Sequence, residues 1–126
     1  GSDTAFNDGS DCTQPEGQDP GLSRIGWYNK NGENSIHAVA KKLPNAWGLY
    51  DVHGSVWEWC NDASLDDPDY PTGPVTDPKG ASSGEYRIVR GGSWESYAGA
   101  CRAAARDNDH PKEHDFSIGF RVVKKR

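Results

Sequence analysis

The chain has 126 residues, of which 33% are hydrophobic, and it contains five Trp, 15 Gly and no Met. Its formal net charge of −5 argues against a nucleic-acid partner, because phosphate binding needs a basic face. No stretch approaches the roughly 20 apolar residues that cross a bilayer, so no membrane span is expected.

Residues 1–23 are rich in Asp, Gly, Gln and Pro, and Phe6 and Leu22 are their main apolar side chains. Such a composition cannot drive its own collapse. We therefore expect a polar segment that is extended or partly disordered, draped over the rest of the chain or tied by a ligand. The domain itself is expected to span residues 24–126.

Within 24–126, apolar runs bounded by turn residues predict short strands at 36–40, 56–60, 86–89, 102–106 and 120–123. Alternation places Trp57 and Trp59 on one face of their strand and Glu58 on the other. Helix signals are nearly absent, and the best of them runs from His37 to Lys42. Residues 61–84 are too long for an ordinary connection, which indicates a functional or flexible loop.

Three motifs follow one another along the chain. Residues 48–60 read GLYDVHGSVWEWC, residues 90–94 read RGGSW, and residues 118–121 read IGFR. In this order and with these gaps they resemble the formylglycine-generating enzyme, or sulfatase-modifying factor, family. The resemblance covers about residues 27–123 and implies a C-type-lectin-like fold. This is an irregular α+β domain with short strands, long loops and little helix.

Members of that family normally begin with a segment that carries a Met-Gly strand and two helices. Nothing in this sequence corresponds to it. The resemblance therefore leaves three alternatives: the chain is a fragment, the segment is supplied by another polypeptide, or the domain is a reduced version. The missing N-terminal part of the domain is accordingly one expected partner.

A carboxylate pair, Asp51 and Glu58, surrounds a bend at Gly54. Calcium prefers six to eight oxygens from carboxylates, carbonyls and water, and this spacing can supply several. The resemblance implies the same site, formed by the Asp51 side chain, the carbonyls of Gly54 and Val56, and the Glu58 carboxylate. Such an ion would staple a loop-rich fold with a small core. The alternative is that both carboxylates accept backbone amides or pair with an arginine such as Arg90.

The resemblance also implies copper(I) chemistry, because the family's oxidase holds copper between two cysteines that follow the Gly-Gly-Ser motif. The corresponding positions here are Ser96 and Cys101. Copper(I) needs thiolate or thioether ligands, and a serine hydroxyl is a poor replacement. We therefore expect neither copper nor formylglycine-generating activity, and Cys101 is only a weak catalytic candidate. It is expected to be a buried strand residue or, as second choice, half of a disulfide with Cys60.

The segment at 95–117 is rich in the small, polar and aromatic residues that adaptable binding loops favour. It resembles the variable region of retroelement-diversified ligand-binding proteins, a branch of the same fold. Such regions draw on a restricted set of residue types, and Glu95, Lys112 and Glu113 are not in that set. The predicted ligand-binding residues are Tyr97, Asp107, Asn108, Asp109, His110, His114, Asp115 and Phe116.

The preferred function is a non-catalytic, calcium-stabilised ligand-binding domain that uses the loops after Trp94, with an unidentified protein or small molecule as ligand. The alternatives are an oxidoreductase of the formylglycine-generating type and a structural accessory domain. Three cysteines constrain the compartment weakly, and a bacterial cell-surface, periplasmic or secreted location is favoured.

Overall fold

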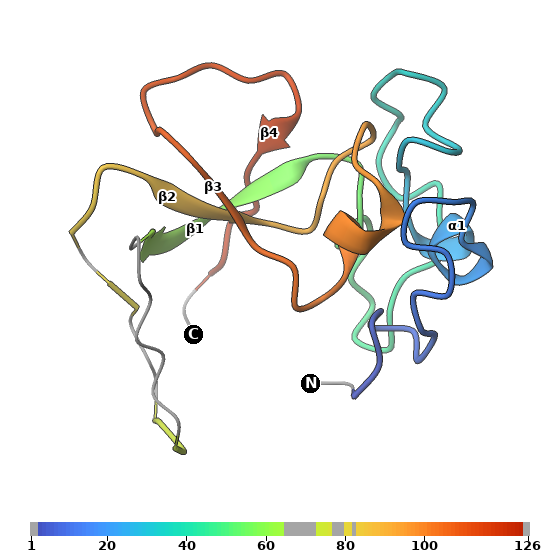
Figure 1. Ribbon diagram of the computed structural model, residues 1–126, viewed down its shortest axis with the longest axis horizontal. Coiled ribbons are helices and arrows are strands. Elements are labelled where there is room, and N and C mark those ends of the chain that lie inside the picture. Colours follow the sequence, from blue (N-terminus) through green and yellow to red (C-terminus); the bar gives the residue numbers. More distant parts are fainter. Residues whose placement is uncertain (1–2, 65–72, 77–79, 82, 125–126) are drawn as a thin grey trace.

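The computed structural model describes residues 3–64, 73–76, 80–81 and 83–124, so half of the long loop expected at 61–84 lies outside the described residues. Among these described residues, four short strands form one sheet in the order β3-β2-β1-β4 (Figure 1). β1 pairs in antiparallel fashion with β2 and in parallel with β4. The elements are α1 (Pro20–Ile25), β1 (Trp57–Ala63), β2 (Arg87–Arg90), the 3-10 helix η1 (Ala98–Cys101), β3 (Asp107–Asp109) and β4 (Ile118–Gly119). No helix within the described part of the chain could cross a membrane.

Helix α1 begins at a strong N-terminal signal. The fully buried Asp19 is its N-cap and accepts a hydrogen bond from the Leu22 amide at 2.9 Å, and Pro20 follows at the first helical position. The other carboxylate oxygen accepts the amides of Thr13, at 2.8 Å, and Gln14, at 3.1 Å. Burial raises the pKa of Asp19, but these amides outweigh it and leave the pKa below its usual range. One side chain thus starts the helix and fixes the preceding loop.

The core is a cluster of buried side chains around α1, and it draws on both ends of the chain. Its members are Phe6, Leu22, Ile25, Tyr28, Ala98 and Cys101. The expected domain boundary near Ser23 therefore falls inside α1, and Phe6, from the polar N-terminal segment, is completely buried. Figure 1 shows this segment lying beside α1 and η1. Aromatic area concentrated in a few positions makes so small a core possible.

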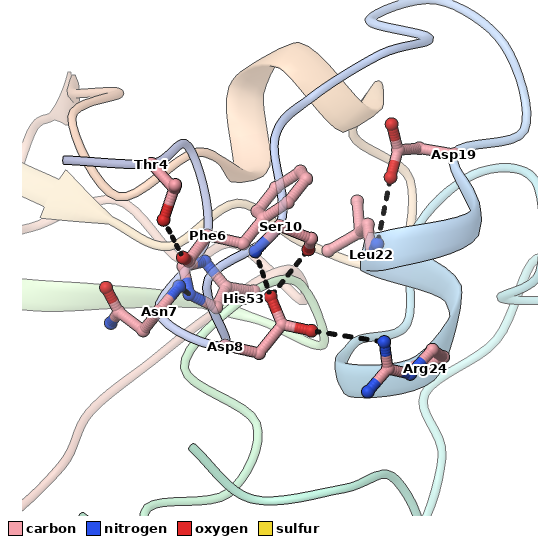
Figure 2. Close-up of polar contacts among 9 residues, drawn as sticks. All are labelled: Thr4, Phe6, Asn7, Asp8, Ser10, Asp19, Leu22, Arg24 and His53. Atoms are coloured by element: carbon pink, nitrogen blue, oxygen red, sulfur yellow. Dashed lines mark hydrogen bonds and ion pairs between the residues drawn. The ribbon is translucent and has the colours of Figure 1, made fainter. Parts of the chain in front are cut away.

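The imidazole of His53 fastens the N-terminal segment to the rest of the fold (Figure 2). Its Nε2 accepts the Asn7 amide at 3.0 Å, and its Nδ1 lies 2.8 Å from the Cys101 carbonyl oxygen. A carbonyl can only accept, so Nδ1 carries the proton and the ring is neutral. Phe6 packs edge-on against it, with ring centroids 5.4 Å apart. Burial lowers the pKa of His53, against weaker opposing effects of the Cys101 carbonyl and Asp8.

Two expected strands lie close to observed ones, since β1 and β2 overlap 56–60 and 86–89. The strand expected at 102–106 is wrong: the Arg102 side chain bonds Gly99, and the Ala105 amide bonds Arg102, which makes a turn. β3 begins only at Asp107. The strand expected at 120–123 is also wrong, because pairing with β1 ends at Gly119.

Residues 36–42, expected as a strand or as the best helix, form neither element. Ile36 is 57% exposed and Val39 is 78% exposed, so their apolar side chains do not mark a buried face. Ala40 has a left-handed φ of 58°, which interrupts both helix and strand geometry. The segment contains apolar residues, but the tertiary structure leaves their side chains at the surface.

Candidate functional site

The predicted ligand-binding residues lie in three different places. Tyr97 stands just before η1, is 56% exposed, and has the Lys30 ammonium 5.9 Å from its ring centroid. Asp107–Asp109 form the edge strand β3, paired only with β2 in the sheet. The residues from His110 to Phe116 form the loop that connects β3 with β4, which Figure 1 shows as the long arc between the two strands.

His110 shapes the start of this connecting loop. Its carbonyl accepts the Glu113 amide at 2.9 Å, and its Nδ1 accepts the Lys112 amide at 3.2 Å. The ring packs edge-on against Tyr86, with centroids 5.9 Å apart, and its Nε2 lies 4.0 Å from a carboxylate oxygen of Glu85. These contacts give His110 a structural role at the turn.

The end of the loop is anchored by Asp115 and Ser117. Asp115 Oδ1 accepts both the amide and the hydroxyl of Ser117, each at 2.6 Å. The carbonyl of the buried Ser117 accepts the Trp57 amide at 2.8 Å, which ties the loop to the start of β1. Between the two anchors Phe116 is left 69% exposed, with its ring centroid 6.0 Å from that of Trp94.

Beside this loop lies a cavity of about 480 Å³, lined by Trp59, Glu113, His114, Asp115, Phe116 and Ile118. Three predicted ligand residues, His114, Asp115 and Phe116, thus share one hollow. The sequence-based prediction did not include Trp59, which was placed on one face of its strand with Trp57, or Glu113, which is outside the residue types expected in such variable regions. Trp59 is only half-buried. Trp59 reaches the cavity because β1 pairs with β4. That pairing is visible only in the tertiary structure, so the sequence alone gave no signal for it.

The positions that correspond to the family's copper ligands are occupied in a different way. The Ser96 hydroxyl accepts the Ser93 amide at 2.9 Å and lies 3.1 Å from the Ser93 hydroxyl. Cys101 is completely buried, and burial, with a smaller effect of Cys12, raises its pKa to about 12. Its thiol is therefore protonated at neutral pH and unsuited to nucleophilic attack. All three cysteines, each in the described part of the chain, are free.

Asp51 lies in a left-handed turn, with φ 56°, between Tyr50 and β1. Its Oδ2 accepts the Ala40 amide at 2.7 Å, whereas its Oδ1 is buried and has no hydrogen-bond partner among the described residues. Gly54, with φ 76°, bends the chain, and a Cβ there would collide with the Trp27 carbonyl. A buried carboxylate oxygen that accepts no hydrogen bond is the kind of atom that can coordinate a cation.

Glu58 pairs with Arg121 rather than Arg90. The guanidinium donates to Oε2 at 3.0 Å and to Oε1 at 2.7 Å, and it also donates to the Tyr50 carbonyl at 2.9 Å. Hydrogen bonding to Glu58 raises the pKa of Arg121, and the charge of Asp51 adds to this effect. Arg90 instead donates to the Ala103 carbonyl.

The Asp51 and Glu58 carboxylates face a second cavity of about 510 Å³, which is also lined by apolar side chains such as Leu49, Phe120 and Val122. No cluster of three or more His, Cys, Asp or Glu within metal-binding reach occurs among the described residues. The expected calcium ligands comprise only two carboxylates, with backbone carbonyls as the others.

Comparison with curated proteins finds relatives of several kinds. The chain is 37% identical over 97 residues to the formylglycine-generating enzyme of Streptomyces coelicolor, which covers 75% of the chain and 31% of the enzyme. It is 42% identical over 99 residues to that of Thermomonospora curvata, covering 75% and 33%. Similarity to the serine/threonine-protein kinase pkn1 of Chlamydia pneumoniae is 37% over 89 residues, covering 64% and 13%. The chain thus spans about a third or less of these proteins.

Solved structures give the same picture. Treponema denticola variable protein 1 matches with a TM-score of 0.74 and 36% identity, over 90% of this chain and 41% of that one. PvdO from Pseudomonas aeruginosa matches with a TM-score of 0.70 and 28% identity, over 89% and 45%. The expected irregular α+β fold, and the resemblance to both the oxidase family and the variable proteins, are confirmed. Residues 3–126 match the family described as sulfatase-modifying factor enzyme 1-like domain, and the chain belongs to this family.

Proposed function

We propose that this domain is a non-catalytic ligand-binding module, stabilised by calcium, whose binding site is the loop between β3 and β4. The observation that carries the proposal is the cavity beside Phe116. It combines an exposed aromatic ring, two carboxylates and a half-buried indole, within a loop anchored at both ends. Ligand sites typically combine apolar walls with a few polar groups in this way.

Similarity to a variable protein supports a binding role, since the matched structure covers 90% of this chain. Within the proposed site, His114, Asp115 and Phe116 form the centre. Asp107 and Asn108 are exposed on the neighbouring edge strand and could extend the contact surface. Tyr97 does not line this cavity and is not part of the proposed centre.

Ser96 and Cys101 argue against the competing oxidoreductase function. An oxidase of this family needs two soft ligands, and here one is a hydroxyl bonded to Ser93 while the other is a buried, protonated thiol. Because some relatives are named formylglycine-generating enzyme, the oxidoreductase alternative should be tested directly. Incubation with copper(I) and a cysteine peptide should consume no oxygen above background. Turnover that disappears in Cys101→Ala would support the enzyme instead.

Calcium belongs to the same proposal, with Asp51, Glu58 and the carbonyls of Gly54 and Val56 as ligands. The partnerless Asp51 Oδ1 fits a cation. Glu58 fits less well, because Arg121 already donates to both of its oxygens. Each carboxylate oxygen has a second lone pair, so Glu58 can still coordinate an ion that shares it with the guanidinium. The bound ion would hold the loop before β1 in place.

The proposed binding site can be tested with a fragment library, followed by NMR through the indole N–H signal of Trp59. Fragments that bind the cavity should shift this signal, and Phe116→Ala should weaken their binding about tenfold or more, because it removes one aromatic wall. Phe120→Ala is the matched control: Phe120 is 77% exposed, similar to Phe116, but it lines the other cavity. Hits that survive Phe116→Ala unchanged would place binding elsewhere.

A further inference from the structure

The cavity beside Phe116 has an unusual charge distribution for so open a surface. The described residues that line it include two carboxylates, Glu113 and Asp115, and neither Lys nor Arg. Among them, the one other titratable residue is His114. A negatively charged ligand would meet both carboxylates at close range. A cationic ligand would be attracted to them, and the net charge of −5 adds to that attraction.

Asp115 is held in a fixed orientation by its own loop. Both bonds from Ser117 end on Oδ1, and no donor to Oδ2 occurs within the described part of the chain. Its carboxylate therefore does not have to be immobilised when a ligand donates to it, which reduces the entropy cost of binding. The Glu113 side chain is exposed and contributes charge from two positions earlier in the loop.

The walls of the cavity are aromatic and aliphatic. Trp59 is supplied by β1, Ile118 by β4, and Phe116 by the loop between β3 and β4. A cation that lies over an aromatic face is stabilised by the ring quadrupole, and a planar guanidinium also stacks on it. An ammonium is more strongly hydrated and loses more on leaving water. The aliphatic Ile118 suits the methylene stem of a long side chain.

We propose that this cavity binds a guanidinium group, as carried by an arginine side chain, between the aromatic walls and the carboxylates of Glu113 and Asp115. The proposal rests on the ligand-binding function of the same cavity and specifies its ligand. The chain already uses this chemistry internally, because the Arg121 guanidinium forms a two-point contact with Glu58. At the Phe116 cavity the guanidinium would come from outside the chain.

The test is a set of NMR titrations with three peptides, acetyl-Gly-X-Gly-amide with X as arginine, lysine or citrulline. Citrulline has nearly the shape of arginine but no charge. The arginine peptide should bind at least about tenfold tighter than the citrulline peptide, because charge-assisted hydrogen bonds are the stronger kind. It should also bind more tightly than the lysine peptide, and its affinity should fall as salt is added.

Glu113→Gln combined with Asp115→Asn should remove this preference while keeping the loop, because an asparagine oxygen can still accept the two Ser117 bonds. Glu95→Gln is the matched control, since it deletes one exposed carboxylate that does not line the cavity. A third arm titrates methylguanidinium alone. Equal affinity for it and the arginine peptide indicates a small-molecule ligand, and tighter peptide binding indicates a polypeptide; both results support the guanidinium site.

Three results would overturn the inference, and they differ in what they say about the site. If arginine and citrulline peptides bind equally and Phe116→Ala weakens both, the cavity is a ligand site without charge selection. If none of the guanidinium compounds shifts the Trp59 signal while library fragments do, the cavity still binds ligands, but its ligand belongs to a different chemical class. Absence of any shift with both peptides and fragments would reject the function as well.

Discussion

Residues 5–28 and residues 110–118 are both rich in polar side chains, but they use them in different ways. In the first region the buried carboxylate of Asp19 accepts hydrogen bonds from backbone amides, and the buried imidazole of His53, from outside this region, bonds the Asn7 amide and the Cys101 carbonyl. In the second region Asp115 caps one short turn, and the side chains of Glu113, His114 and Phe116 remain exposed. Satisfied buried groups specify a fold, whereas exposed groups on an anchored loop are available to a ligand.

The largest expected difference between the two regions appears when one aromatic ring is removed from each. Phe6→Ala should lower the free energy of unfolding by about 3–5 kcal/mol, because it leaves a hole in a small core that also packs against His53. Phe116→Ala should change it by less than about 0.5 kcal/mol, since that ring is 69% exposed. Urea denaturation measures both. A loss above about 1.5 kcal/mol in Phe116→Ala would make the ring structural and remove the contrast between the regions.

Calcium should have an intermediate effect, on the segment that leads into β1. If the proposed site binds calcium, the ion should raise Tm and add about 2.7 kcal/mol of stability at a concentration 100 times Kd. Asp51→Asn should weaken this response, because it removes a charge from the ligand whose Oδ1 lacks a partner. Differential scanning calorimetry with calcium and with chelator measures the shift. Asp107→Asn serves as a control, and equal Tm values with and without calcium would reject the ion.

A smaller effect is expected from pH at His53. Burial lowers its pKa in the folded state, so the unfolded chain binds this proton more tightly. The stability contributed by the neutral ring is therefore complete above the unfolded value of about 6.5 and is lost progressively as pH falls below it, until the folded state is protonated too. Protonation at Nε2 would also place a proton against the Asn7 amide hydrogen. Unfolding free energies measured between pH 7.5 and 5 test the slope.

His53→Gln should flatten that dependence, whereas His114→Gln, at an exposed position, should preserve it. Because the Asn7 amide is the group displaced, its protection against hydrogen exchange, measured relative to the intrinsic exchange rate at each pH, should fall at low pH before the protection of β1 does. A simultaneous fall at both places would mean that the N-terminal segment does not open as a separate unit.

Much of the scaffold could be predicted from sequence because its determinants are local. The alternation in 56–60 and the run at 86–89 identified β1 and β2 to within a few residues. The apolar runs at 36–40 and 120–123 failed, since a strand needs a neighbour and these have none in the sheet. Helix α1 was missed although Asp19-Pro20 is a strong start signal, because the segment is short and its surroundings are polar.

The candidate site was only half visible in the sequence. His114, Asp115 and Phe116 were identified from composition, and the exchange of a copper ligand for Ser96 was read directly from the motif. The partners of these residues were not, because Trp59 and Ile118 reach the cavity through the parallel pairing of β4 with β1 across some 60 positions of sequence. Likewise, no local pattern links Glu58 to Arg121.

The sequence by itself determined the family, through three ordered motifs, and it determined that one of the two expected copper ligands is a serine. Only the tertiary structure decided how these parts are used. It buried Phe6, which belongs to a segment whose composition indicates no core, together with His53, and it joined Trp59 to the Phe116 loop in one cavity. The physical reason is that motifs record local backbone and side-chain requirements. Burial and cavity shape depend instead on contacts between residues far apart in the chain.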